Sequence, residues 1–149
     1  MEWRDITIAI VGSEQSGKKE YLEALLKNSI QFVDAEEDEE RDIIHCEFIW
    51  RVDNKLVYID SILCPDWNYL DDKKLDLIIT IEPINQQPDK VGHLHLMSKM
   101  DIFSDMEEYA FQFRKQHPEV PTIIISSLTG YNIDRSIDMV FSLTKCLRK

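Results

Sequence analysis

A glycine-rich segment directly after an apolar run constrains this chain most. Residues 6–11 are mostly apolar, and the next seven read Gly12-Ser13-Glu14-Gln15-Ser16-Gly17-Lys18. This is the G-x-x-x-x-G-K pattern, in which glycines let backbone N–H groups surround a phosphate and the lysine reaches the terminal phosphates. The Ser or Thr that should follow and hold Mg²⁺ is replaced by Lys19. The pattern predicts a phosphate-binding loop with weakened Mg²⁺ binding; a glycine-containing turn without a ligand is the open alternative.

Composition narrows the class of protein and its partners. The 149 residues are predicted to form one domain, residues 1–149, and a hydrophobic fraction of 44% with 30% charged residues is typical of soluble globular proteins. A net charge of −11 argues against nucleic acid or an anionic membrane surface as a partner. It does not exclude one bound nucleotide, because a phosphate loop acts through local backbone dipoles. No apolar run approaches the ~20 residues that span a bilayer, so membrane insertion is not expected. Three cysteines, an odd number without a disulfide framework, suggest a reducing, cytoplasmic location.

Apolar runs and helical periodicity predict an α/β fold. Helices are expected from the phosphate loop onward, from Ser104, and over about 132–147. Strand-like runs alternate with these helices, which predicts a mostly parallel sheet with helices on both faces. The expected strands cover residues 5–11, 43–51, 55–61, 75–81, about 93–97, and 121–126.

Two connecting segments are unusual. The acidic run over residues 34–42 is expected to be a solvated, mobile loop, with an acidic docking surface or cation trap as the alternative. Residues 82–90 hold two prolines and leave little room for the helix that a parallel crossover normally needs. We therefore expect a shortened, irregular crossover and, near it, an apolar sheet face that is poorly covered and could receive a partner protein.

The order of the motifs resembles the small GTPase superfamily of Ras-like P-loop proteins over nearly the whole chain. The phosphate loop comes first, Asp60-Ser61-Ile62-Leu63 resembles the D-x-x-G motif, and Ser98-Lys99-Met100-Asp101 resembles [NT]-K-x-D. Ser126-Ser127-Leu128 then resembles the family's last base-contacting motif. The resemblance implies phosphate binding by residues 12–19 and an Mg²⁺ contact of Asp60 through bound water. It also implies guanine recognition, in which Asp101 selects the base while Lys99 and Ser127 frame it, within the set Ser98, Lys99, Asp101, Ser126, Ser127 and Leu128.

The departures from the family pattern concentrate in the phosphate-switching motifs. No threonine lies between Lys18 and Asp60, Leu63 replaces the glycine of D-x-x-G, and no glutamine follows to orient water. Phosphoryl transfer depends on such positioning groups, so GTP hydrolysis is expected to be very slow or absent, and no catalytic residue is assigned. The chain thus resembles a divergent or pseudo-GTPase. The short crossover gives a weaker likeness to the P-loop proteins of ethanolamine and propanediol utilisation in bacterial microcompartments.

Two functions of different classes remain open on these grounds. The first is a guanine-nucleotide-binding protein that binds GTP or GDP, with Mg²⁺ weakened by Lys19. The second is a nucleotide-free pseudo-GTPase that serves as a structural or adaptor subunit for a protein partner. A metal site at His93 and His95 is not favoured, because no third ligand has a telling spacing. Trp67 is expected to be a packing residue, with a partner anchor as the alternative.

Overall fold

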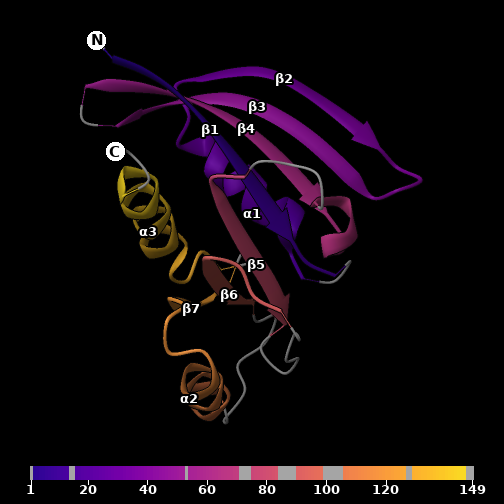
Figure 1. Ribbon diagram of the computed structural model, residues 1–149, viewed down its shortest axis with the longest axis vertical. Coiled ribbons are helices and arrows are strands. Elements are labelled where there is room, and N and C mark those ends of the chain that lie inside the picture. The colour runs from indigo at the N-terminus through magenta and orange to yellow at the C-terminus, as the bar shows by residue number, and fades with distance from the viewer. Residues whose placement is uncertain are drawn as a thin grey trace.

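The computed structural model describes residues 2–13, 16–52, 54–70, 75–83, 90–98, 106–126 and 129–146. Its strands form one seven-stranded sheet in the order β2-β3-β4-β1-β5-β6-β7 (Figure 1). The strands are Glu2–Val11 (β1), Gln31–Asp38 (β2), Ile43–Val52 (β3), Lys55–Cys64 (β4), Leu77–Pro83 (β5), Leu94–Ser98 (β6) and Thr122–Ile125 (β7). The helices are Lys18–Lys27 (α1), Met106–Gln116 (α2), Ile133–Cys146 (α3) and the short 3₁₀ helix Trp67–Leu70 (η1).

The sheet combines a parallel part with an antiparallel ribbon. Strand β1 pairs in parallel with both β4 and β5, and β5, β6 and β7 continue the parallel part. Strands β2 and β3 run antiparallel and attach to the outer side of β4. The carboxyl ends of the parallel strands therefore share one edge of the sheet, which is where α/β proteins place their ligands.

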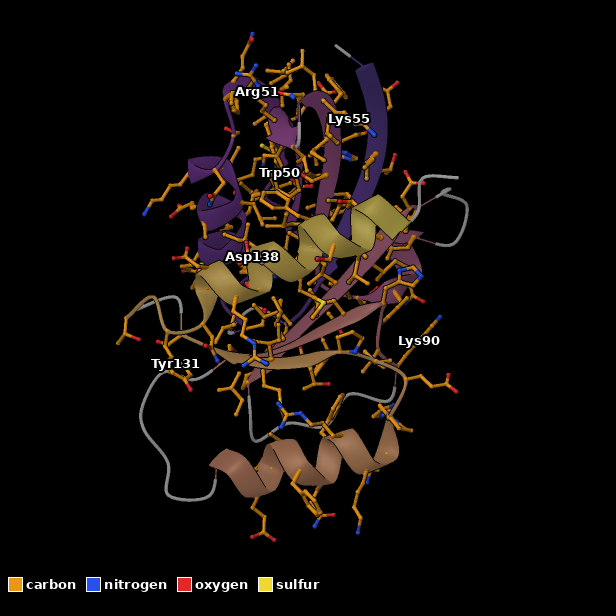
Figure 2. All side chains as sticks on the ribbon, turned by 90° about the vertical axis from the view of Figure 1, so that its left-hand side faces the viewer. Trp50, Arg51, Lys55, Lys90, Tyr131 and Asp138 are labelled. Carbon is orange, nitrogen blue, oxygen red and sulfur yellow. The ribbon has the colours of Figure 1, made fainter. Side chains whose placement is uncertain are left out.

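Helices α1 and α3 cover one face of the sheet. Tyr21 and Leu25 of α1 and Ile137 of α3 are buried against the apolar side chains of the central strands. The Tyr21 hydroxyl donates a hydrogen bond of 3.0 Å to Ser136 Oγ and ties the two helices together. Trp50 of β3 is fully buried beside them: its Nε1–H donates to the Leu25 carbonyl at 3.2 Å, and its ring packs edge-on against Phe141 of α3 (Figure 2).

The opposite face is covered in two separate places. Helix α2 packs Ala110 and Phe113 against Met97 and Ile124, next to the β7 edge of the sheet. The 3₁₀ helix η1 packs against a second apolar cluster that includes Ala9, Val11, Ile62, Cys64 and Leu70. Figure 1 shows α2 at the β7 end of the molecule, far from the β2–β3–β4 ribbon.

The predicted α/β class and all six expected strands are confirmed, together with helices at the phosphate loop and near 132–147. The acidic run is a correction: residues 34–38 belong to the edge strand β2, although they are solvated as expected, and a turn follows at 39–42. Ser104 and residues 84–89 lie outside the described residues; the described residues 90–93 contain no helix.

The expected bare apolar face is a second correction. Near the crossover, Ala9, Val11, Ile62 and Cys64 are buried beneath η1 and its neighbours. The part of this face farther along the strands is partly exposed but largely polar, with His45, Glu47, Tyr58 and Asp60. No helix in the described part of the chain is long and apolar enough to cross a membrane.

Candidate functional site

The glycine-rich loop follows β1 and leads directly into α1. At each of its two glycines the backbone leaves no room for a side chain or adopts a conformation that favours glycine. A Cβ on Gly12 would lie 2.3 Å from the Ile81 carbonyl oxygen and 2.5 Å from Ser16 Oγ, so a side chain does not fit there. Gly17 has φ 86°, in the left-handed region that glycine adopts without strain. The described residues of the loop therefore have the backbone shape that the G-x-x-x-x-G-K pattern predicts.

The amino end of α1 carries positive charge toward the loop. Gly17 is the N-cap residue, and because glycine has no side chain it cannot accept a hydrogen bond from the first N–H groups of α1 in the way a serine or aspartate would. The Lys18 side chain is only 4% exposed, and its Nζ lies 3.3 Å from the Ser13 carbonyl oxygen. A helix amino terminus combined with a buried lysine is an arrangement that binds anions, phosphates included.

Carboxylates of the chain already meet this positive site. Asp42 Oδ2, in the turn between β2 and β3, accepts a hydrogen bond from Lys18 Nζ at 2.9 Å. Glu82 Oε1, at the end of β5, accepts from the Ser13 backbone N–H at 2.6 Å. Both contacts occupy N–H donors of the glycine-rich segment, one from its backbone and one from the Lys18 side chain.

The sheet register explains how these two carboxylates reach the loop. Val11 lies beside Thr80 in the parallel β1–β5 pair, so Glu82 follows alongside Ser13. On the other side, Ile44 pairs with Leu63, and the Gly12 N–H donates to the Cys64 carbonyl at 3.2 Å, which brings the start of β3 near the loop. The residue before β3 is Asp42.

Lys19, which replaces the Mg²⁺-binding hydroxyl, lies on the surface. Its Nζ is 3.2 Å from Glu37 Oε1 of β2, and both side chains are about half exposed. The hydrogen bond and the charge of Glu37 raise the pKa of Lys19 above its ordinary value. Lys19 therefore stays cationic and lies next to Lys18, where it adds positive charge rather than a metal ligand.

Two small pockets flank the loop. One, of about 250 Å³, is lined by Lys18, Lys19, Glu20 and Asp42. The other, of about 270 Å³, lies between the loop and the residues after β4, and includes Ser13, Trp67 and Glu82 in its lining. Lys90 Nζ lies 4.3 Å from the centre of the Trp67 ring (Figure 2 labels Lys90). Trp67, the first residue of η1, packs against the apolar cluster beneath this helix and makes this cation–π contact, as expected of a packing residue.

Asp60 is not brought to the phosphate loop. The strand that was expected to end at Asp60 continues to Cys64, and Asp60 pairs with Thr7 in the middle of β1. At about 3.3 Å per residue, Asp60 lies some 13 Å along β4 from the residue that contacts the loop. That residue is Cys64, which is buried and forms no disulfide. The aspartate of the D-x-x-G match therefore lies too early in β4 to reach the loop. The residue beside the loop, Cys64, carries a thiol instead of a carboxylate.

The predicted base-contacting residues are only partly described. Ser98 ends β6, and Ser126 follows β7; because Ser98 pairs with Ile125, both serines lie at the carboxyl edge of the sheet. Ser126 is buried, its N–H donates to the Tyr131 carbonyl, and its carbonyl accepts from the Gly130 N–H at 2.8 Å. Lys99, Asp101, Ser127 and Leu128 lie outside the described residues, as do Glu14 and Gln15 of the phosphate loop.

The two histidines at the start of β6 have different surroundings: His95 is buried within the strand, whereas His93 precedes it and is exposed. His95 is fully buried, stacks on Phe113 at 4.3 Å, and places Nδ1 2.7 Å from Thr80 Oγ1. Burial, helped by the nearby His117, lowers the pKa of His95 to about 4. His93 Nδ1 accepts from the Ile78 N–H at 2.9 Å. No group of three or more potential metal ligands occurs among the described residues.

Sequence reasoning missed Asp42 and Glu82 as members of the site. Glu82 carried a usable signal, because it follows an apolar parallel strand and must lie at the same edge as the loop. Asp42 carried none, because it is one carboxylate in a long acidic run, and only the β2–β3 turn decides which of them faces Lys18.

Comparison with solved structures identifies the fold. The G domain of the T. maritima FeoB iron transporter matches with TM-score 0.63 and 16% identity, over 94% of this chain and 99% of that one. The selenocysteine-specific bacterial elongation factor EF-Sec matches with TM-score 0.65 and 16% identity, over 98% of this chain and 29% of that one. Elongation factor SelB from Methanococcus maripaludis, in complex with the GTP analogue GppNHp, matches with TM-score 0.61 and 13% identity, over 97% and 35% of the two chains.

These similarities confirm the fold that the motif order predicted. The chain has the P-loop fold of GTPase G domains, and it corresponds in extent to the isolated FeoB G domain but to about a third of the two elongation factors. No family model matches the sequence. No curated protein matches it either.

Proposed function

We propose that this chain is a small guanine-nucleotide-binding protein with little or no GTP hydrolysis. The observation that carries the proposal is the loop itself: Gly12 and Gly17 shape the backbone, and buried Lys18 lies at the amino end of α1, which Gly17 does not cap with a side chain. This combination binds the phosphates of a nucleotide. The fold is shared with an elongation factor whose structure holds a GTP analogue.

The proposed site has a phosphate half and a base half. Residues 12–19 bind the phosphates, with Lys18 as the main cation. Asp101 accepts hydrogen bonds from the guanine edge, and Lys99 and Ser127 frame the ring; Ser98, Ser126 and Leu128 complete this half. A buried carboxylate discriminates strongly between bases, because a base that lacks the matching donors leaves the carboxylate unpaired.

Slow hydrolysis follows from the groups that stand near the phosphate loop. Lys19 replaces the Mg²⁺-binding hydroxyl, Cys64 occupies the end of β4, and no threonine precedes β3 after Lys18. Asp60 is left out of the proposed site because it lies in mid-strand. Mg²⁺, if bound, would have to be held mainly by the nucleotide, so we expect nucleotide affinity to depend little on the metal.

Calorimetric titration of nucleotide-stripped protein with GDP and GTP tests the proposal, once with Mg²⁺ and once with a chelator. We expect saturable binding of guanine nucleotides but not of ATP. Lys18→Ala should abolish it, whereas Lys27→Ala, at the exposed far end of the same helix, should not change it. Asp101→Asn should weaken guanine binding and admit xanthine, because an acceptor becomes a donor. Unchanged affinity in both Lys18→Ala and Asp101→Asn would contradict the nucleotide site.

A second function, a nucleotide-free adaptor subunit, is favoured by the edge strand β2. All eight of its residues are exposed, among them Phe32 at 55% and Val33 at 41%. Four of these eight residues are acidic, so a partner that added a strand here would have to be basic. No heat and no thermal stabilisation at millimolar GDP or GTP would favour this function over the first.

A further inference from the structure

The contact between Asp42 and Lys18 places a carboxylate of the chain where a phosphate would bind. The Nζ–Oδ2 distance is 2.9 Å, and Lys18 is 4% exposed whereas Asp42 is 31% exposed. The pair is thus reached from solvent on the aspartate side. The adjoining pocket is lined by Lys18, Lys19, Glu20 and Asp42, so a phosphate that reaches Lys18 through it also meets the Asp42 carboxylate.

Asp42 is held in this place by the β2–β3 turn. Its φ of 56° is uncommon for a residue other than glycine, although Asp and Asn are the side chains that tolerate it best. The last paired residues of the hairpin are Asp38 and Ile43, so Asp42 is the last residue of the turn, directly before the first paired residue of β3. Moving the Asp42 side chain far from Lys18 therefore requires the turn itself to change.

The hairpin has a second link to the loop, through its outer strand β2. Lys19 pairs with Glu37 of β2 at 3.2 Å. Strand β2 is at the sheet edge, pairs with β3 alone, and buries none of its side chains. Segments with few buried contacts open at low cost in free energy, so β2 and its turn can move without unfolding the core.

We propose that the β2–β3 turn is an intramolecular latch, in which Asp42 occupies Lys18 until the phosphates of a guanine nucleotide displace it. The inference rests on the proposed nucleotide site and assigns its regulation. A phosphate and the Asp42 carboxylate are both negatively charged and compete for the same donor, so they cannot both contact Lys18. Nucleotide binding therefore releases the turn, and by reciprocity any partner that holds the turn open raises nucleotide affinity.

Glu82 strengthens the competition from the other side of the loop. Its carboxylate accepts the Ser13 N–H at 2.6 Å, so a phosphate that takes this donor must also displace Glu82. Glu82 belongs to β5 in the central sheet, however, and only its side chain needs to turn away. The conformational change that nucleotide binding transmits is therefore expected in the β2–β3 hairpin and not in β5.

Asp42→Asn tests the latch in the full chain, because asparagine keeps the shape and the left-handed backbone preference while the charge is lost. Calorimetry of nucleotide-stripped protein should give GDP affinity on the order of tenfold tighter than in the wild type. Glu40→Gln is the matched control: it removes one charge from the same exposed turn, and the affinity should stay at the wild-type value. Circular dichroism confirms that both variants fold.

The outcomes separate the latch from the nucleotide site. If the wild type binds GDP and Asp42→Asn binds it with equal or weaker affinity, the latch is overturned, whereas the nucleotide site is not. Equal gains in Asp42→Asn and Glu40→Gln also overturn it, because general charge repulsion would then suffice. Binding in Asp42→Asn alone supports the latch. If neither the wild type nor Asp42→Asn binds GDP, the proposed function fails and the latch fails with it.

Hydrogen exchange gives a second, independent measurement. Saturation of the wild type with GDP should speed amide exchange over residues 36–44, at the end of the hairpin that holds Asp42, and leave β5 unchanged. In Asp42→Asn this segment should exchange fast before GDP is added. Wild-type exchange that is unchanged or slower on saturation overturns the latch.

Discussion

The two edge strands of the sheet occupy equivalent positions and have opposite surroundings. Strand β7 has four residues, all buried, because α2 packs on one face and α3 on the other. Strand β2 has eight residues, all exposed, and no helix of the described residues covers either of its faces (Figure 1). The difference shows that pairing alone creates an edge strand, whereas helices decide whether that strand becomes part of the core.

The same difference divides the carboxyl edge of the sheet. The side proposed to read the base follows β6 and β7, which are fixed between helices. The phosphate side lies next to the β2–β3 turn, which supplies Asp42 from an uncovered ribbon. Strands held between helices beside a carboxylate carried by an uncovered ribbon form an arrangement in which one part of the molecule can change without disturbing the other.

The largest expected effect comes from removing the side chain that anchors α2. Phe113→Ala deletes a fully buried ring that packs on Met97, Ile124 and His95, and large-to-small changes of this kind cost about 3–5 kcal/mol. Urea denaturation followed by circular dichroism measures the free energy of unfolding. Phe111→Ala on the same helix, whose ring is 56% exposed, should change it by less than about 1 kcal/mol. Equal losses in both variants would contradict the packing of α2 against the β7 edge.

The next effect is a pH dependence that originates in the same cluster. His95 has a pKa of about 4 in the folded chain, compared with about 6.5 when unfolded, so the unfolded state binds the proton first as the pH falls. The stabilisation from neutral His95 is fully present above pH 6.5, declines as the pH falls, and is lost near pH 4. Its upper size is about 3 kcal/mol.

Comparison with His95→Gln isolates this effect from the many carboxylates of the chain. The free energy of unfolding should fall more steeply between pH 6.5 and 4 in the wild type than in the variant. His93→Gln, on an exposed side chain close to the same strand, should keep the wild-type slope. Parallel curves for the wild type and His95→Gln would show that His95 titrates normally and is not sealed between β6 and α2.

Much of this architecture could be predicted from the sequence because local rules and the final structure agree. The apolar run before Gly12 is a buried parallel strand, Gly17 needs a left-handed backbone, and Tyr21 and Leu25 recur at helical spacing; each signal refers to one element. The fold could then be inferred from the order of the motifs. The same reasoning placed the glycine-rich loop between the first strand and the first helix, where the structure has it.

The features that the sequence did not predict depend on pairing between segments. Strand β2 has no buried face, so Gln31–Asp38 shows no apolar alternation and reads as a polar loop; hydrogen bonds to β3 make it a strand. Asp60 was placed at a strand end by a four-letter motif, but the register of β4 on β1 extends the strand to Cys64. Asp42 contacts Lys18 only because the turn between β2 and β3 brings it there.

The smallest expected effect belongs to β2 itself. Phe32 lies opposite Phe48 in the β2–β3 pair but is 55% exposed, so Phe32→Ala should change the free energy of unfolding by less than about 1 kcal/mol. In native-state hydrogen exchange, amides of residues 31–38 should open at far lower free energy than those of residues 122–125. A loss above about 2 kcal/mol in Phe32→Ala, or equal exchange at the two edges, would mean that β2 belongs to the cooperative core. The turn that holds Asp42 could then not move by itself, because opening it would require the sheet to unfold.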